Sequence, residues 1–351
     1  MDKLQLVARL LDRVGGKHVD KLARWSGVLG LNYHRIGSAS GSPYDHALYS
    51  ATQEGFAEQM AFLARNFDVI GPADLAGLGD APKGRHVLVT FDDGYRDNYE
   101  IAFPVLRAQG LSATFFVTVG FLDEGALAWW DEIAWMVRKS TRPRLPAGEW
   151  LDAELSLAEP HRETTIHALL KKYKSLLGTR SEGFVAWLAE ATGSGRCPSA
   201  SARETWMTWD MVREMRDGGM TIGGHTVHHP VLSRLSADEQ AKEIVGTGER
   251  LRAELGEPMR FFAYPVGGRD AFDANTRRAL EHAGVELAFS YYGGYRRPGD
   301  WDRYDVRRVA IESSHDGPSF RATVCLPSLY GTHEGGLSQR LRATAFDLLA
   351  R

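Results

Sequence analysis

The chain has 351 residues and a formal net charge of −3. This near balance argues against a general nucleic-acid binder, because such proteins carry a strong basic excess. The hydrophobic fraction of 43% is typical of a globular protein with a full core, and the length is enough for one large domain or two modest ones. The two cysteines, Cys197 and Cys325, form no CxxC pair, which favours a reducing compartment, although a bridge between them stays open.

Residues 1–27 are predicted to form an amphipathic helix at the N-terminus. Apolar side chains share one stripe at helical spacing, namely Leu4, Val7, Leu10, Leu11 and Val14. Two interpretations stay open: a helix packed on the domain surface, or peripheral contact with an anionic membrane surface through residues 2–25. The first residues lack the apolar core of a secretory signal, and no stretch approaches the ~20 apolar residues of a membrane span. We therefore expect a cytoplasmic protein, with a peripheral position at the inner membrane face as an extension.

From residue 28 onward, strand-like and helix-like patterns alternate. Strands are predicted at 28–33, 67–70, 86–91, 112–118, 220–223, 260–264, 286–290 and 306–311. Helices are predicted at 53–66, 98–109, 209–217, 236–255 and 271–283. Repeated βα units imply parallel strands with helices outside, so the fold class is α/β. About seven such units favour a closed barrel over an open sheet.

A mostly helical stretch, about 121–205, interrupts this alternation. We expect it to be an insertion in one barrel loop, so that the barrel spans 28–320 and a helical tail spans 321–351. Its tryptophans Trp129, Trp130 and Trp135 are expected in the core, with the lining of a substrate groove as the alternative.

Two short motifs carry the chemistry. Residues 90–95 read Thr-Phe-Asp-Asp-Gly-Tyr and residues 225–230 read His-Thr-Val-His-His-Pro, each after an apolar strand. His225 and His229 are close enough for both rings to reach one metal ion, and Asp93 fits as the third ligand. The neighbouring Asp92 would stay off the metal and act as a base toward a water molecule. Either motif alone is weak evidence, but both follow strands, and barrel active sites lie at the carboxyl ends of strands.

These residues resemble the first two motifs of the polysaccharide deacetylases, carbohydrate esterase family four, also called the NodB-homology domain. The flanking sequences agree, and Phe262-Ala-Tyr-Pro-Val-Gly267 is similar to the family's third motif. The resemblance covers roughly residues 28–120 and 206–311. It implies a distorted (β/α)7 barrel and a divalent metal, first of all Zn2+ with Co2+ or Ni2+ as alternatives, bound by Asp93, His225 and His229. It also implies Asp92 as general base and the backbone N–H of Tyr95 in an oxyanion hole.

Two departures from the family pattern concern the residues around this centre. The Arg that the family aims at its base is replaced by Ala263, and Arg260, Arg269 and Arg308 are candidates to supply the charge. We favour Arg308 because it lies on a late strand. The usual C-terminal Leu-x-Leu-His strand is also absent. Instead residues 29–36 (Leu-Gly-Leu-Asn-Tyr-His-Arg-Ile) resemble the opening of circularly permuted members, which implies that His34 protonates the leaving amine.

The leading hypothesis is a metal-dependent hydrolase that removes the N-acetyl group of an amino sugar. The sugar would belong to a polysaccharide, a glycolipid or a lipid-linked precursor. A sugar N-deformylase on the same fold is a close variant. A non-catalytic carbohydrate-binding homologue is supported by the altered third motif and opposed by the intact Asp92, Asp93, His225 and His229. An unrelated amidohydrolase would predict a His-x-His pair after the first strand, which the sequence lacks.

Overall fold

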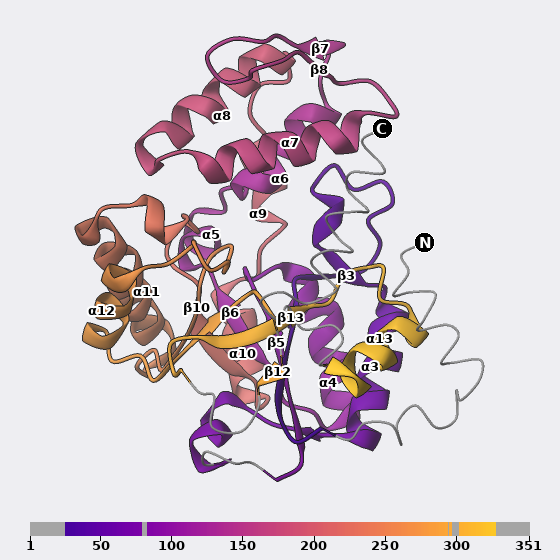
Figure 1. Ribbon diagram of the computed structural model, residues 1–351, viewed down its shortest axis with the longest axis vertical. Helices are drawn as coiled ribbons and strands as arrows, with labels where there is room; N and C mark the ends of the chain where they lie inside the picture. The colour runs from indigo at the N-terminus through magenta and orange to yellow at the C-terminus, as the bar shows by residue number, and fades with distance from the viewer. Residues whose placement is uncertain (1–24, 79–82, 294, 297–301, 328–351) are drawn as a thin grey trace.

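The computed structural model describes residues 25–78, 83–293, 295–296 and 302–327. Its centre is a closed barrel of seven parallel strands, as the sequence predicts (Figure 1). Around the barrel the strands are β1 (Gly27–Tyr33), β13 (Val306–Ala310), β11 (Leu287–Ser290), β10 (Phe261–Ala263), β9 (Thr221–Gly224), β6 (Thr114–Val117) and β5 (Arg85–Phe91). Pairing of β1 with β5 along seven residues closes the ring. The fold is therefore the distorted (β/α)7 barrel.

The distortion is concentrated where short additional strands pair beside the barrel. Strand β4 (Asp68–Val69) pairs with the beginning of β5, so β5 pairs with β6 only at Thr90 and Phe91. Strand β12 (Tyr295–Arg296) pairs antiparallel with the beginning of β1, and β13 pairs with its later residues. The barrel is consequently most regular at the carboxyl ends of its strands.

The barrel strands are nearly continuous apolar runs because helices or other strands cover both of their faces. All seven residues of β1 are buried. Between the barrel strands and the outer helices, the rings of Phe91 and Phe115 stack with centroids 4.7 Å apart and pack in the same cluster as Phe56 of α3. Gly30 permits close contact with β13, since a Cβ there would lie 2.8 Å from the Arg307 carbonyl oxygen and 2.9 Å from Arg308 Cγ. This close approach brings β1 against the Arg308 side chain.

Helices cover the outside of the barrel, namely α3 (Gln53–Asn66), α4 (Phe103–Gln109), α10 (Trp209–Asp217), α11 (Ala237–Leu255), α12 (Ala274–His282) and α13 (Gly317–Cys325). Helix α3 has the predicted bounds. The predicted helix at 98–109 is divided into a π-helical turn, Asn98–Ala102, and α4, because Pro104 falls in the first turn of α4. Helix α11 begins after Ser236, whose capping box with Glu239 is formed. Short 3-10 helices, Pro72–Leu78, His46–Leu48 and Leu232–Arg234, and the strand pair β2 (Arg35–Ile36) and β3 (Tyr49–Ala51) complete the connections.

Residues 119–203 contain the helices that the sequence indicates between β6 and β9. They are α5 (Val119–Glu124), α6 (Trp129–Arg138), α7 (Arg162–Ser175), α8 (Gly178–Thr192) and α9 (Ser199–Arg203), with a hairpin of β7 (Arg144–Leu145) and β8 (Leu155–Ser156). In Figure 1, α6, α7, α8 and the hairpin stack at one end of the barrel. They share an apolar cluster that also takes in Tyr95, Phe121 and Trp206. Those three side chains therefore join the inserted helices to the barrel.

Several expectations fall outside the described residues. Residues 1–24, with most of the expected amphipathic helix, and residues 328–351 of the expected tail are among them. Helix α13 crosses the boundary expected between 320 and 321. Among the described helices, none has both the length and the apolar character that crossing a membrane demands. Cys197 is a free thiol, so the two cysteines are not bridged to each other.

Candidate metal centre and its cleft

The motif residues gather at the carboxyl ends of barrel strands. Asp92 and Asp93 follow β5, His225 follows β9 and His34 follows β1, while Arg308 lies within β13. Because all seven barrel strands are parallel, these ends meet at the same rim of the barrel. Residues separated by more than 200 positions in the sequence therefore share one site.

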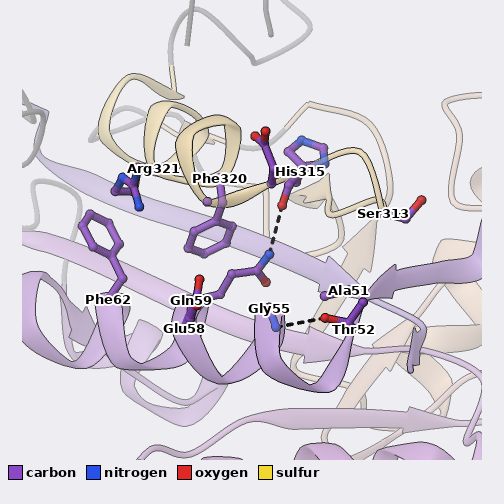
Figure 2. Close-up of a pocket in the computed structure, with 12 residues that line it drawn as sticks. Ala51, Thr52, Gly55, Glu58, Gln59, Phe62, Ser313, His315, Phe320 and Arg321 are labelled. Atoms are coloured by element: carbon purple, nitrogen blue, oxygen red, sulfur yellow. Dashed lines mark hydrogen bonds between the residues drawn. The ribbon is translucent and has the colours of Figure 1, made fainter. Parts of the chain in front are cut away.

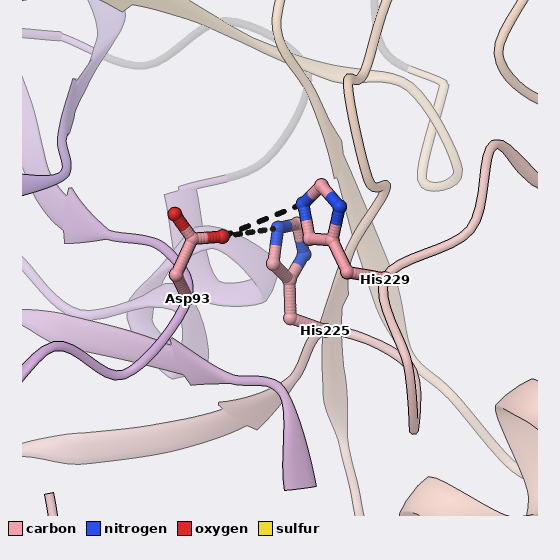
Figure 3. A group of neighbouring side chains, drawn as sticks. All are labelled: Asp93, His225 and His229. Atoms are coloured by element: carbon pink, nitrogen blue, oxygen red, sulfur yellow. Dashed lines mark ion pairs between the residues drawn. The ribbon is translucent and has the colours of Figure 1, made fainter. Parts of the chain in front are cut away.

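Asp93, His225 and His229 form a compact buried cluster (Figure 3). Nε2 of His225 and Nε2 of His229 each lie 3.4 Å from Asp93 Oδ1, and one ligand atom from each residue lies within 4.8 Å of the others. Asp93 Oδ1 accepts no hydrogen bond from the described residues. A buried carboxylate oxygen without a donor is costly, and a cation between the three atoms would satisfy it. One carboxylate and two imidazoles are a donor set that Zn2+, Co2+ or Ni2+ accepts.

The backbone at this cluster adopts conformations that ordinary residues avoid. Asp93, Thr226 and His229 have φ values of 79°, 69° and 56°, in the left-handed region. The hydroxyl of Thr226 accepts a hydrogen bond from the His229 N–H at 2.9 Å and so supports the turn. Such conformations cost free energy and are characteristic of functional sites. Two of the three candidate ligands are thus aimed by a strained backbone.

Hydrogen bonding and packing orient the two imidazoles. His225 Nδ1 lies 2.8 Å from the carbonyl oxygen of Ala263 and donates to it, so Nε2 presents its lone pair toward Asp93. The edge of Trp130 contacts the His229 ring with centroids 4.4 Å apart. Burial, reinforced by the neighbouring His225, lowers the pKa of His229 to about 3. His229 is therefore neutral near pH 7, which is the form that binds metal.

Asp92 lies beside the cluster and is held by Arg308. Nη1 of Arg308 donates to Asp92 Oδ1 at 2.7 Å and Nη2 donates to Oδ2 at 2.9 Å. Burial alone would raise the pKa of Asp92, but the charges of Arg308 and His225 outweigh it and hold that pKa well below its usual range. Asp92 is therefore an oriented carboxylate.

The three arginines considered for this role have different surroundings. Arg260 forms an exposed pair with Glu286 at 2.7 Å, and the Arg269 guanidinium lies 5.0 Å from the Tyr292 ring centroid. Arg308 alone of the three reaches Asp92. A charged group from β13 thus faces Asp92, while the backbone of Ala263 contacts the imidazole of His225.

Asn32 belongs to the same network and was not anticipated from the sequence. Its Nδ2 donates to Asp92 Oδ2 at 3.0 Å, and its Oδ1 accepts from Arg308 Nη1 at 2.7 Å and from the Thr90 hydroxyl at 2.9 Å. The available signal was one amide in the otherwise apolar run from Val28 to Leu31. Its side chain is fully buried, so its polar atoms must find partners inside the barrel.

His34 and Tyr95 have different placements at the rim. The His34 ring packs edge-on against Tyr291 at 5.6 Å and lines the same cleft as Asp92 and Asp93. The Tyr95 phenol points away from it: its hydroxyl donates to Asp131 at 2.9 Å and accepts from Trp130 Nε1 at 2.7 Å. The backbone bridge between Tyr95 and Trp206 uses the Arg96 N–H and the Gly94 carbonyl. The Tyr95 N–H takes no part in that bridge.

The cleft over this rim has a volume of about 460 Å³. Trp129 and Trp130 of α6 line the cleft and are also buried among the inserted helices. These two tryptophans are therefore core residues and cleft-lining residues at once. Trp135 packs against the inserted cluster and is not among the residues that line the cleft. A smaller cavity of about 190 Å³ lies between α3 and α13, where Gln59 Nε2 donates to the His315 carbonyl (Figure 2). None of the motif residues lines that smaller cavity.

Comparison with known proteins gives the same class of protein as the sequence motifs, the polysaccharide deacetylases. The polysaccharide deacetylase family model matches residues 79–141 and 184–288. YxkH of Bacillus subtilis (strain 168), named as a polysaccharide deacetylase, is 21% identical over 243 residues. That match covers 69% of this chain but only 57% of the relative.

Solved structures share the fold. The Streptococcus pyogenes deacetylase PplD, in complex with acetate, aligns with a TM-score of 0.55 and 17% identity over 85% of this chain and 97% of its own. IcaB from Ammonifex degensii aligns with a TM-score of 0.53 and 21% identity over 86% of this chain and 98% of its own. A polysaccharide deacetylase from Bacillus cereus aligns with a TM-score of 0.54 and 19% identity over 85% of this chain and 68% of its own.

The family model, the curated relative and the solved structures thus agree on the polysaccharide deacetylase family as the class that this chain resembles. Membership of the circularly permuted subgroup stays a prediction. The position of β1, between β13 and β5 with His34 at its end, is consistent with it.

Proposed function

We propose that this protein is a metal-dependent hydrolase that removes the N-acetyl group of an amino sugar in a polysaccharide, a glycolipid or a lipid-linked precursor. One observation carries the proposal. A buried Asp-His-His cluster with an unsatisfied carboxylate oxygen lies in one cleft with an oriented carboxylate, Asp92. The family supports the reaction class.

Asp93, His225 and His229 would hold the ion, with Zn2+ as the first choice and Co2+ or Ni2+ as alternatives. A bound ion would polarise the amide carbonyl and lower the pKa of a water molecule. The fixed tautomer of His225 and the neutral ring of His229 prepare the chain for this role.

Asp92 is the base in this proposal. Its Oδ2 accepts hydrogen bonds from Arg308 and Asn32, whereas its Oδ1 accepts one from Arg308. Oδ1 therefore keeps a lone pair for the proton of the attacking water. Arg308 also fixes the plane of the carboxylate, so the lone pair is presented in one direction.

The remaining steps assign the developing charges and the second proton. The Tyr95 N–H would face the oxygen of the acyl group as negative charge develops on it. His34 would give a proton to the sugar nitrogen as the C–N bond breaks. Water then supplies the oxygen of the released acetate, and the sugar leaves as a free amine.

Removal of the base tests the proposal. Asp92→Asn keeps the shape and the Arg308 contact at one oxygen but removes the proton acceptor, so we expect acetate release from N-acetylated oligosaccharides to fall by roughly 10²–10⁴-fold. Metal content, measured by elemental analysis of the purified protein, should stay unchanged. Asp152→Asn, at an exposed position outside the cleft, is the matched control.

Three outcomes would contradict the proposal. The first is full activity of Asp92→Asn. The second is a wild-type protein that binds N-acetylated sugars and releases neither acetate nor formate, which would favour the non-catalytic carbohydrate-binding alternative. Release of formate from N-formyl sugars with no release of acetate would replace the deacetylase with the deformylase.

A further inference from the structure

The wall of the cleft formed by α7 is basic. His167, Lys171 and Lys174 lie at positions i, i+4 and i+7 of this helix and therefore share one face. All three line the cleft that also contains the metal cluster, and all three side chains are exposed. None of them forms an ion pair with any carboxylate in the described ranges. Lys171 and Lys174 thus bring two ammonium groups to the wall of the cleft without a carboxylate in ion-pair contact.

The acidic groups near this wall form their direct contacts with other residues, although the charge of Asp45 acts on Lys174 without an ion-pair contact. Asp45 also lines the cleft, but it is buried and its carboxylate accepts a hydrogen bond from the Ala47 N–H at 3.0 Å. Glu163, one turn before His167, pairs with Arg138 at 2.6 Å. Glu312 is the other acidic lining residue outside the motifs, and it comes from the barrel rim after β13. The positive charge is therefore confined to the α7 wall.

Trp129 fixes the position of this wall relative to the metal cluster. Its ring stacks on Tyr173 of α7 with centroids 4.1 Å apart, and its centroid lies 6.5 Å from that of His229. Lys174 Nζ lies 5.8 Å from the same Trp129 centroid, on the α7 side. The Trp129 ring is therefore close both to the Lys174 ammonium group and to His229 of the metal cluster.

We propose that Lys171 and Lys174, with His167, bind an anionic group carried by the substrate, a phosphate or a carboxylate on the acetylated sugar or on its neighbour. The inference rests on the proposed function, because it assumes that the acetyl group lies at the metal cluster. Ammonium groups bind phosphate and carboxylate oxygens through charge-assisted hydrogen bonds, and a positively lined cleft concentrates anions. Neutral sugars would use the aromatic part of the same cleft without this contact.

Equilibrium binding to the full-length, Zn2+-loaded protein tests the inference. The ligands are N-acetylglucosamine 1-phosphate, a disaccharide of N-acetylglucosamine and glucuronic acid, and neutral N,N′-diacetylchitobiose, titrated calorimetrically in the slow Asp92→Asn background. We expect at least one anionic ligand to bind roughly tenfold more tightly than the neutral one, the scale of two exposed charge contacts. The phosphate and carboxylate arms show which anion is preferred.

Variants separate the lysines from other sources of anion affinity. Lys171→Gln with Lys174→Gln should bring the anionic ligand to the affinity of the neutral one and leave the neutral ligand unchanged. Lys172→Gln, on the same helix but outside the cleft lining, should change neither. An anion preference that survives the double variant would place the anion on the metal and overturn the inference, as would equal binding of all three ligands to the parent protein. Acetate release from the neutral sugar by the wild type tests the proposed function separately.

Discussion

The two walls of the cleft are built in different ways. On the barrel wall, the charged groups Asp92, Asp93 and Arg308 are buried, Asp92 pairs with Arg308, and the backbone is strained at Asp93 and His229. On the inserted wall, aromatic rings of α6 pack together and the lysines of α7 are exposed. The first arrangement fixes reacting groups in position, and the second offers contacts that tolerate change in the substrate. The comparison assigns chemistry to the barrel and recognition to the inserted helices.

Trp130 is where the two walls meet. It belongs to α6, its edge contacts the ring of His229, and its Nε1 donates to the hydroxyl of Tyr95. Through Tyr95 it is linked to Asp131, which also accepts a hydrogen bond from the Asp45 N–H at 2.8 Å. The following variants test whether the barrel wall acts in chemistry and the inserted wall in recognition.

The largest effect is expected on the barrel wall. Asp93→Ala removes the oxygen that both imidazoles face, so we expect loss of the bound metal and a fall in acetate release of roughly 10³-fold or more. Elemental analysis and an acetate assay measure the two effects. Asp152→Ala is the control, and unchanged metal content in Asp93→Ala would remove Asp93 from the ligand set.

Arg308→Met should lower stability in addition to removing the group that orients Asp92. The change leaves Asp92 buried without its guanidinium partner, so we expect the free energy of unfolding to fall by about 3–5 kcal/mol in urea denaturation. The low pKa of Asp92 also means that this pair stabilises the fold above the usual carboxyl range and that its contribution is lost as the pH falls. Combining Arg308→Met with Asp92→Asn should restore part of the loss. If the single change costs nothing, the pair does not stabilise the barrel.

Much of the barrel wall could be predicted from the sequence. Long apolar runs predicted its strands, and Asp92, Asp93, His225 and His229 were recognisable because each motif is contiguous and follows a strand. Arg308 could be favoured because it lies on a late strand. Asn32 could not be assigned, because its role depends on the register of β1 between β5 and β13, where Asn32 lies opposite Thr90 and Ala310.

The inserted wall was predictable only in outline. A mostly helical insertion was expected at about 121–205, and this stretch contains α6, α7 and α8. The position of Trp129 depends on stacking with Tyr173, 44 positions later in the chain, a contact that periodicity within either helix does not specify. The basic face of α7 is visible as a periodic pattern, yet only the fold shows that it lines the same cleft as the metal cluster.

Asp131, which is hydrogen-bonded to Tyr95 between the two walls, can be tested through the pH dependence of stability. Burial is the main reason that its pKa rises from 3.8 to about 7 despite the nearby Arg35 charge, with the Asp45 carboxylate adding to the rise. A raised carboxyl pKa means that the folded state holds its proton longer, so stability should fall as the pH rises from about 4 to about 7. We expect Asp131→Asn to remove that decrease, on the order of 2–4 kcal/mol, in urea denaturation across this range. If the free energy of unfolding varies with pH in the same way for the wild type and for Asp131→Asn, the raised pKa of Asp131 is contradicted.

His34→Ala tests the edge of the barrel wall nearest to β1. If His34 protonates the leaving amine, its loss should slow acetate release by roughly 10–100-fold. Metal content should not change, because the ring lies outside the three-residue cluster. An activated acetate ester, whose leaving group needs no proton, should be hydrolysed at nearly the normal rate by the variant. Loss of metal would instead place His34 among the ligands.

The smallest effect is expected for Trp129→Phe on the inserted wall. The change keeps a ring against Tyr173 but shortens the surface offered to a sugar and removes the indole N–H, which lies 3.4 Å from the His229 carbonyl oxygen. We expect KM to rise by roughly 3–10-fold with little change in kcat, because a contact made equally in the ground and transition states alters binding alone. Steady-state kinetics measure this division, and Trp187→Phe, in the same apolar cluster but outside the cleft lining, is the control. A fall in kcat together with loss of metal would show that Trp129 supports His229, and the separation of chemistry from recognition would then fail at this residue.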